Sequence, residues 1–424
     1  MIVLSILYFT SFIILLLLLN LIIKKVYTQK AFCFGLLFFF LLIPATLFAN
    51  IGGALVDLPF YQSVVINYSN ADIVLTMLVL SLIIAFIIML EGFSVIKLKK
   101  RAIDINKCLS ISKCFMYFTL VVGGLSFFFF IIQFDSISQM LSYGEYSRSF
   151  LYDISSIISI KYARLIVPAR MIMVSPLLCI FLYSNTKEKR YFILFVVSII
   201  LAGILMLYNS GKTLILTYFL CFAIPVLKKR FKHPWIILII SGFAFLPVLG
   251  FLDSVFSYLT TGSFVFEGGD VYKYLSSFSY PFKNFINRDG ILSISGFRYG
   301  KDFVTSFLSL IPGLEFEPSY VPTSIFHGGV NWRSGTPNDF LMFSYLQAGY
   351  IGIILISFFI AAISKRIDDG LQSLPGNYGS QVIVSAVTIQ FFSLAGSADL
   401  CSIIKSNYVL VILFIVIILS TRKS

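Results

Sequence analysis

"MIVLSILYFTSFIILLLLLNLII", from Met1 to Ile23, decides the fold class, because no residue in this stretch carries a charge. A helix that crosses a bilayer needs roughly 18 or more such residues. The whole chain has the same character: 58% of its 424 residues are hydrophobic and 12% are charged, against about 25% charged in a soluble domain. The stretch has no basic segment and no small-residue cleavage site, so we expect a retained helix and not a signal peptide. The composition predicts an all-α polytopic membrane protein.

Hydropathy predicts about eleven transmembrane helices, which alternate with polar connections. The predicted spans are 2–23, 31–49, 73–90, 114–132, 165–183, 191–207, 213–227, 235–252, 340–363, 380–396 and 406–420.

The charge distribution predicts the orientation of these spans. Of the 32 Lys and Arg residues, 20 fall in alternate connections. These basic connections are 24–30, 91–113, 184–190, 228–234, 364–379 and 421–424. Cytoplasmic loops carry such an excess, so we expect the N-terminus outside and the C-terminus inside. The net charge of +13 is therefore a topology signal, and nucleic acid is not an expected partner.

One outer connection, residues 253–339, dominates the predicted organisation and is called the cap below. It separates residues 1–252, with eight predicted spans, from residues 340–424, with three. Loops longer than about 15 residues are usually functional or disordered, and this loop is too aromatic for disorder. In "FVTSFLSLIPG" (303–313), five apolar residues fall near one helical face: Phe303, Phe307, Leu308, Leu310 and Ile311. This pattern predicts a short helix on the membrane surface.

Two basic residues lie within or between predicted spans. Arg170 lies inside the span at 165–183, where a charge is costly and often functional; the alternative is a side chain that reaches the interface. Lys212 lies in a short outer turn, "YNSGKTLIL" (208–216). The spacing of its glycines does not fit a phosphate-binding P-loop. Lys212 is therefore either a headgroup-facing turn residue or a cation at the mouth of the bundle.

The cap carries further candidates for chemistry. Arg298 and Lys301 lie in "SGFRYGKDF" (295–303), where flanking glycines allow a tight backbone and Arg can hold phosphate with two hydrogen bonds. His327 is a candidate base, although a lone loop histidine is more often structural. Asp339 precedes a predicted span. Either Thr336 or Asn338 caps that helix and Asp339 favours its N-terminal dipole, or Asp339 accepts a proton from a sugar hydroxyl. The six cysteines form no CxxC pair, and no disulfide framework or metal site is expected.

Three stretches resemble one protein family. "GFRYGKDFVTSFLSLIPG" (296–313), "RSGTPNDFLMFSYLQAGYIGIIL" (333–355) and "YNSGKTLIL" resemble motifs of the O-antigen polymerase (Wzy-type) family of oligosaccharide repeat unit polymerases. Gly349 and Gly352 match a GxxG pair in that family, and Lys212 stands where Arg is usual. Related O-antigen ligases carry His-Asn before the equivalent span, whereas this chain has Pro337-Asn338.

The resemblance implies a GT-C-like glycosyltransferase in the bacterial cytoplasmic (inner) membrane, with its active site on the periplasmic face. It would transfer a growing glycan from undecaprenyl pyrophosphate to the next lipid-linked repeat unit, making O-antigen or capsule. No metal or other cofactor is expected; the expected partners are membrane lipids and a separate chain-length regulator. The implied pyrophosphate-binding residues are Arg298, Lys212, Arg170 and Lys301. The implied base is Asp339 or else His327, and candidate glycan-binding residues are Arg288, Tyr299, Trp332 and Arg333.

Three other functions stay open at this stage. An O-antigen ligase shares the architecture but lacks its expected histidine here. A polysaccharide flippase or other transporter would be expected to show internal repeats and a site at the membrane midplane, which the hydropathy pattern does not indicate. A membrane scaffold or sensor would not need the clustered cations of the cap.

Overall fold

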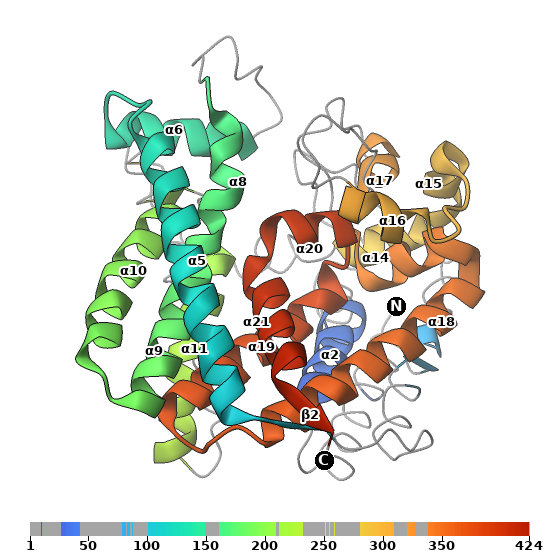
Figure 1. The fold of residues 1–424 in the computed structure, drawn as a ribbon. Coiled ribbons are helices and arrows are strands. Elements are labelled where there is room, and N and C mark those ends of the chain that lie inside the picture. Colours follow the sequence, from blue (N-terminus) through green and yellow to red (C-terminus); the bar gives the residue numbers. More distant parts are fainter. Residues whose placement is uncertain are drawn as a thin grey trace.

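The chain is a mostly helical membrane protein (Figure 1). The structure, a computed structural model, describes residues 10, 27–42, 79–81, 83–84, 87, 101–148, 161–208, 212–231, 251, 254, 258, 280–308, 320–326 and 338–423. The predicted spans at 2–23 and 235–252, and most of the one at 73–90, lie outside these residues.

Five helical segments in the described part of the chain are long and apolar enough to cross a membrane. They are α5 (Ile105–Ile131), the segment Ala163–Thr186, α10 (Lys189–Tyr208), α18 (Phe340–Gln372) and α19 (Tyr378–Gly396). They match the spans predicted at 114–132, 165–183, 191–207, 340–363 and 380–396. Apolar side chains such as Val121, Leu125 and Phe128 on α5, and Ile193 and Ile200 on α10, are exposed. That exposure fits helices whose outer faces contact lipid.

Three more helices cover further predicted spans. The first is α2 (Thr28–Leu37) with the π-helical turn η1 (Phe38–Leu42), the second is α11 (Lys212–Arg230), and the third is α21 (Tyr408–Ser420). They match the spans predicted at 31–49, 213–227 and 406–420. The α2 helix packs along α19, where Gly35 lies against the backbone of Phe392, and its Phe32 ring meets Phe340 edge-on at 5.0 Å.

The segment Ala163–Thr186 is less regular than the single helix predicted at 165–183. It consists of a 3-10 turn η3 (Ala163–Leu165), α8 (Ile166–Ala169), a second 3-10 turn η4 (Arg170–Val174) and α9 (Ser175–Thr186). Pro168 and Pro176 lie in α8 and α9. Proline has no backbone N–H to donate, which accounts for the local departure from α-helical hydrogen bonding.

The basic connections meet at one end of the bundle. Two three-residue strands, β1 (Arg101–Ile103) and β2 (Thr421–Lys423), pair antiparallel there, a feature too short for hydropathy to predict. The Ile103 amide donates to Ser373 Oγ at 2.7 Å, and Asn377 Nδ2 donates to Asn185 Oδ1 at 2.8 Å. These contacts therefore link residues from four predicted basic connections: 91–113 contacts both 421–424 and 364–379, and 364–379 contacts 184–190.

Helices extend further into two of these connections than predicted. The α5 helix begins at Ile105, because the side chain of Asp104 accepts hydrogen bonds from the next amides and caps it. The α18 helix continues to Gln372, since buried Asp368 on its last turns accepts the amides of Tyr27 and Thr28. The carboxylate thereby satisfies amides at the start of α2 that have no partner within that helix.

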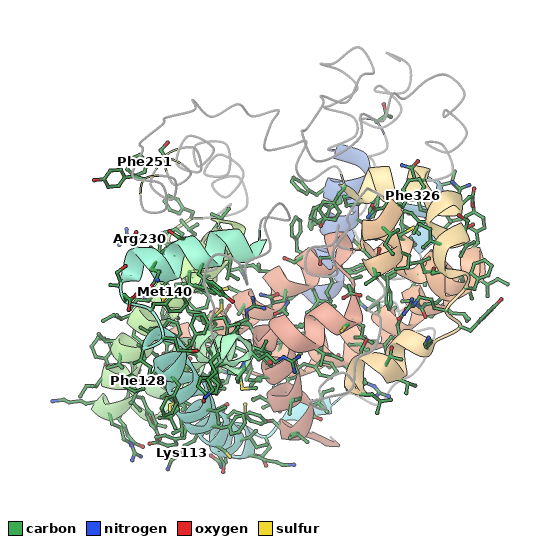
Figure 2. The ribbon with its side chains drawn as sticks, turned by 90° about the horizontal axis from the view of Figure 1, so that it is seen from above. Lys113, Phe128, Met140, Arg230, Phe251 and Phe326 are labelled. Carbon is green, nitrogen blue, oxygen red and sulfur yellow. The ribbon has the colours of Figure 1, made fainter. Side chains whose placement is uncertain are left out.

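Short helices gather at the opposite end (Figure 1). They are α6 (Ile137–Arg148), α14 (Tyr280–Ile286), α15 (Arg288–Ser295), α16 (Lys301–Leu308), α17 (Tyr320–Phe326) and α20 (Leu400–Ser406). Figure 2 looks down on this end: α6, which carries Met140, lies over one group of helices, and Phe326 of α17 lies over the other. The cap therefore contains short helices, as predicted.

The predicted surface helix in the cap is only partly as expected. The α16 helix ends at Leu308, and Leu310 and Ile311 lie outside the described residues. Val304, Phe307 and Leu308 are exposed, but the Phe303 ring packs between Phe343 and Phe359 of α18. One part of the apolar surface of α16 thus packs on α18, and the other part is exposed.

A break interrupts α18, where the sequence predicted one continuous span. Ala348 and Gly349 have non-helical backbone angles, and Gly349 has φ +62°. With its ψ of −144°, this conformation lies close to a region that essentially only glycine adopts. After the break the chain passes so close to its own preceding turn that a Cβ atom on Gly352 would overlap the Ser344 carbonyl oxygen. The GxxG pair is therefore the local requirement for this bend.

We predict that Gly352→Ala lowers the melting temperature of the detergent-solubilised protein. Forcing a methyl group into this packed position costs about 1–3 kcal/mol. The control is Gly203→Ala in α10, where an added Cβ meets nothing within 4 Å; alanine there favours the helix. Equal melting temperatures for Gly352→Ala and the wild type would contradict the close approach.

Candidate functional site

The candidate site lies where the cap helices meet the first turns of α18. Asp339 precedes α18 and is its N-cap: one carboxylate oxygen accepts the Met342 amide at 3.0 Å. The other accepts Asn284 Nδ2 of α14 at 3.4 Å. Both Asp339 and Asn284 are fully buried. The prediction that Thr336 or Asn338 caps this helix is therefore wrong, because Asp339 itself is the capping residue.

Burial also changes the acidity of this carboxyl. Desolvation, opposed by the hydrogen bonds from Met342 and Asn284, raises the pKa of Asp339 to about 7. A base works best when its pKa lies near the working pH. The Asp339 carboxylate can therefore both cap α18 and accept a proton.

Asn338 ties the approach to α18 to two other elements. Its carbonyl oxygen accepts the Ala398 amide at 2.8 Å, and its Oδ1 accepts Thr323 Oγ1 of α17 at 2.5 Å. Nearby, the Tyr280 hydroxyl of α14 donates to the Gly396 carbonyl at 2.6 Å. Hydrogen bonds from α14, α17 and the end of α19 thus hold the backbone around Asp339.

A second polar contact joins the cap to the break in α18. The amides of Arg298 and Tyr299 donate to the carbonyls of Leu346 and Gln347 at 2.8 and 2.9 Å. The Gly300 amide donates to the Gln347 side-chain oxygen at 3.1 Å. The break leaves these carbonyls without helical partners, and the turn 298–300 supplies the missing donors. We call this set of contacts the cap clamp.

Arg298 is paired within the cap clamp. Its Nε donates to both carboxylate oxygens of Asp302, at 2.7 and 2.9 Å, and Gln347 Nε2 donates to the same carboxylate at 2.6 Å. Arg298 and Asp302 are both buried. Desolvation raises the pKa of Asp302, while Gln347 and Arg298 oppose that rise. The charge of Arg298, predicted to bind pyrophosphate, is therefore already balanced by a protein carboxylate.

The other predicted pyrophosphate residues fall in two places. Lys301 is exposed at the start of α16, next to the cap clamp. Arg170 is half-buried in the irregular segment, within electrostatic range of Tyr208 at the end of α10 and Tyr408 at the start of α21. Lys212 begins α11, and its side chain lies outside the described residues. Arg170 thus lies between α10 and the start of α21, while α16, which Lys301 begins, packs on α20, the helix that precedes α21.

The predicted glycan-binding residues are described only in part. Arg288, at the start of α15, stacks on the rings of Phe285 and Tyr345. Tyr299 is exposed on the turn of the cap clamp. His327, Trp332 and Arg333 lie outside the described residues, so their predicted roles stay predictions.

Sequence reasoning missed three polar residues of the site. Gln347 is a polar residue within an apolar span, a signal that could have marked it as a packing contact. Asn284 gave no such signal, because its partner Asp339 lies far away in the sequence. Asp302 stands four residues after Arg298, a spacing that favours an ion pair. Within the described ranges, no group of three or more His, Cys, Asp or Glu residues is placed to hold a metal ion.

Comparison with protein-family models, with curated proteins and with solved structures finds no match to this chain.

We predict that single and double substitutions of the buried ion pair behave differently. Arg298→Met alone leaves the Asp302 carboxylate buried without its cation, and breaking such a pair costs about 3–5 kcal/mol. Arg298→Met with Asp302→Leu removes both charges and should recover most of the lost thermal stability. A double variant no more stable than Arg298→Met would contradict the pairing.

We also predict a pH dependence of stability that Asp339→Asn removes. An unfolded Asp has a pKa of about 3.9, whereas the folded value is about 7. Between these values the folded state binds more protons, so the free energy of unfolding falls as the pH rises towards 7. Asn keeps the N-cap but cannot ionise.

The measurement is the melting temperature of wild type and Asp339→Asn from pH 4.5 to 8. The variant should gain stability relative to wild type up to about pH 7, and the difference should then level off. Other titrating groups, including Asp302, are common to both proteins and cancel in the comparison. A constant difference would show that the folded-state pKa is not raised.

Proposed function

We propose that this chain is a membrane glycosyltransferase that polymerises undecaprenyl-pyrophosphate-linked repeat units into surface polysaccharide, O-antigen or capsule. The observation that carries the proposal is the place of Asp339: a fully buried carboxyl that caps a membrane-spanning helix and is held by Asn284 of the cap. Burial also raises the pKa of this carboxyl to about 7. The place of Asp339 adds a physical argument to the sequence resemblance, which rests on residues 296–313 and 333–355 and on the turn at 208–216.

The proposal includes an orientation in the membrane. The basic connections meet at one end of the bundle and the cap helices gather at the other, which supports a cytoplasmic basic end and a periplasmic cap. We further propose eleven spans, a GT-C-like arrangement and the bacterial inner membrane as the location. The proposed partners are the lipid-linked glycans, membrane lipids and a chain-length regulator.

In the proposed reaction, Asp339 is the general base. Its carboxylate accepts the proton of an acceptor-sugar hydroxyl, whose oxygen attacks the anomeric carbon of the donor glycan. The bond from that carbon to the pyrophosphate oxygen breaks, and lipid pyrophosphate leaves with its charge. Arg170, Lys212 and Lys301 are the proposed cations that stabilise the leaving group. His327 is the alternative base.

The structure changes our proposal for one residue. Since Arg298 is held by Asp302 in the cap clamp, we propose that it positions the cap and does not contact the pyrophosphate. Both roles predict that Arg298→Met abolishes polymer. Only the positioning role predicts that the Arg298→Met, Asp302→Leu double variant regains polymer together with its fold.

A transporter is the second candidate, because one observation favours it. Transporters bind substrates at interrupted helices, and α18 is interrupted at Ala348 and Gly349. However, the cap clamp already occupies the carbonyls of Leu346 and Gln347, which a transported substrate or ion would need. This occupancy favours a fixed cap over an open transport site. A ligase stays the third candidate.

We predict that Asp339→Asn reduces polymer formation by at least about 10²-fold, the usual effect of losing a general base. The matched control is Asp104→Asn. Asp104 also caps a helix but lies at the opposite end of the bundle, so polymer should be retained. Both variants must be present in the membrane at wild-type amounts. Full activity of Asp339→Asn would reject Asp339 as the base.

The experiment that separates the candidate functions is a gel of surface lipopolysaccharide after deletion of the gene. A polymerase leaves core with a single repeat unit. A ligase leaves unmodified core and polymer still on the carrier lipid, whereas a flippase leaves single units on the inner leaflet. An unchanged ladder with unchanged capsule would reject all three.

A further inference from the structure

We propose that an aromatic platform on the cap is a glycan-binding subsite, with Tyr299 and Arg288 as its contact residues. This inference rests on the proposed function, which supplies the identity of the glycan. The platform consists of Phe285, Arg288, Phe297, Tyr299, Tyr345 and Tyr350. The proposed ligand is an uncharged or weakly acidic oligosaccharide segment of the repeat unit. Its sugar faces would stack on the three exposed rings, Phe297, Tyr299 and Tyr350, which the buried rings of Phe285 and Tyr345 support.

The platform is continuous across three elements. The centroid of the Tyr345 ring on α18 lies 6.2 Å from that of Phe285 on α14 and 6.3 Å from that of Phe297. The ring of Tyr350, beyond the break, lies 5.4 Å from Tyr345 between centroids. Phe297 in turn contacts Tyr299 at 5.8 Å. Sequence alone pairs none of these elements. The cap clamp aligns them, since it fixes the Tyr299 backbone to Gln347.

Tyr299 is an unusual residue for its position. Its φ is +44°, in the left-handed region that a residue with a side chain rarely adopts, and its side chain is 78% exposed, the most of any large apolar residue in the described part of the chain. The strained backbone costs of order 1–3 kcal/mol, and the exposed ring gains only its contact with Phe297. Such a cost at an exposed aromatic is expected where the ring contacts a ligand.

Arg288 supplies hydrogen-bond donors that the protein uses little. Its guanidinium carbon lies 5.2 Å from the Phe285 ring centroid and 5.9 Å from that of Tyr345. One nitrogen donates to the Phe285 carbonyl at 3.3 Å, while the buried Nε has no acceptor. The distance to the Asp289 carboxylate is 3.7 Å, beyond a good hydrogen bond. A guanidinium placed over two rings, beside an exposed carboxylate, matches the paired hydroxyls of a sugar.

The platform lies close to the candidate base. Tyr345 is six residues beyond Asp339 within the regular first part of α18, which corresponds to about 9 Å along the helix axis. Tyr345 also donates to Asp289 at 3.2 Å, which links the platform to α15. A glycan on the platform would therefore extend towards Asp339.

An alternative use of the same rings is insertion into the lipid headgroups, where tyrosine is enriched. The underused donors of Arg288 and the exposed carboxylate of Asp289 favour sugar hydroxyls. The most exposed apolar residues of α16, Val304 and Phe307, belong to another part of the cap surface and provide the comparison below.

The first test measures binding of the free repeat-unit oligosaccharide, cleaved from its carrier lipid by mild acid, to the full chain in nanodiscs. Tyr299→Ala should weaken binding at least about tenfold, as for a contact that dominates binding, and Tyr299→Trp should retain it. Arg288→Met should also weaken binding. Phe307→Ala, a matched exposed aromatic outside the platform, should bind as wild type does.

Equal affinities for wild type, Tyr299→Ala and Arg288→Met would overturn the subsite. Asp339→Asn should bind the oligosaccharide normally while making no polymer. Polymer formation by the wild type without platform-dependent binding would reject the subsite alone. Platform-dependent binding by a wild type that makes no polymer would reject the proposed reaction and keep the subsite.

The second test locates Tyr299 relative to the membrane. A nitroxide label is attached to Tyr299→Cys in a Cys114→Ser background, since the other five cysteines are buried. If Tyr299 faces water, the nitroxide should be more accessible to a water-soluble nickel chelate than to oxygen, which concentrates in the bilayer. A label at Val197→Cys, exposed midway along α10, provides the lipid reference. Oxygen-dominated collisions at Tyr299, like those at Val197, would overturn the subsite in favour of lipid insertion.

Discussion

The contact between the turn 298–300 and the broken part of α18 is the constraint on which the rest of the site depends. Within or near a bilayer, a backbone carbonyl without a hydrogen-bond donor is costly, since no water replaces the lost helical partner. The break at Ala348 and Gly349 frees such carbonyls, and the Arg298 and Tyr299 amides bind them. The bent helix and the cap therefore require each other: neither arrangement is stable without the donors or acceptors of the other.

This mutual requirement explains how a long loop obtains a defined geometry at a membrane edge. The buried pair of Arg298 and Asp302, joined by Gln347, fixes the turn from within. At the other end of the first part of α18, Asn284 from α14 holds the carboxylate of Asp339. The candidate base and Tyr345, the ring that joins the aromatic platform together, are thus placed on one short, regular stretch of helix. A site built on a helix keeps its spacing better than one built on a loop.

Much of the architecture could be predicted from the sequence, because a continuous apolar run has few alternatives to a membrane helix. The α5, α10 and α19 helices follow their predicted spans for this reason. A capped start of α18 could be predicted from the polar residues before an apolar run, but the prediction placed the cap at Thr336 or Asn338 and not at Asp339. The break in α18 could not be predicted, since Gly349 alone is tolerated in many straight helices. The role of Arg298 was also unpredictable, because Gln347, which completes its pairing with Asp302, lies 45 residues from Asp302 in the chain. The position of Asn284 beside Asp339 depends on the folded cap as a whole.

The central claim is that this chain, by itself, joins lipid-linked glycans with Asp339 as the base. The most direct measurement is the rate at which the purified full chain, in proteoliposomes, converts purified lipid-pyrophosphate repeat units into polymer and free lipid pyrophosphate, followed from pH 5 to 9. We expect polymer without any added protein, and kcat/KM that rises with pH and levels off above about pH 7, as the carboxyl with its pKa of about 7 loses its proton. Absence of both products from active, folded protein would contradict the glycosyltransferase. Polymer formed at a rate independent of pH across this range would contradict Asp339 as its base.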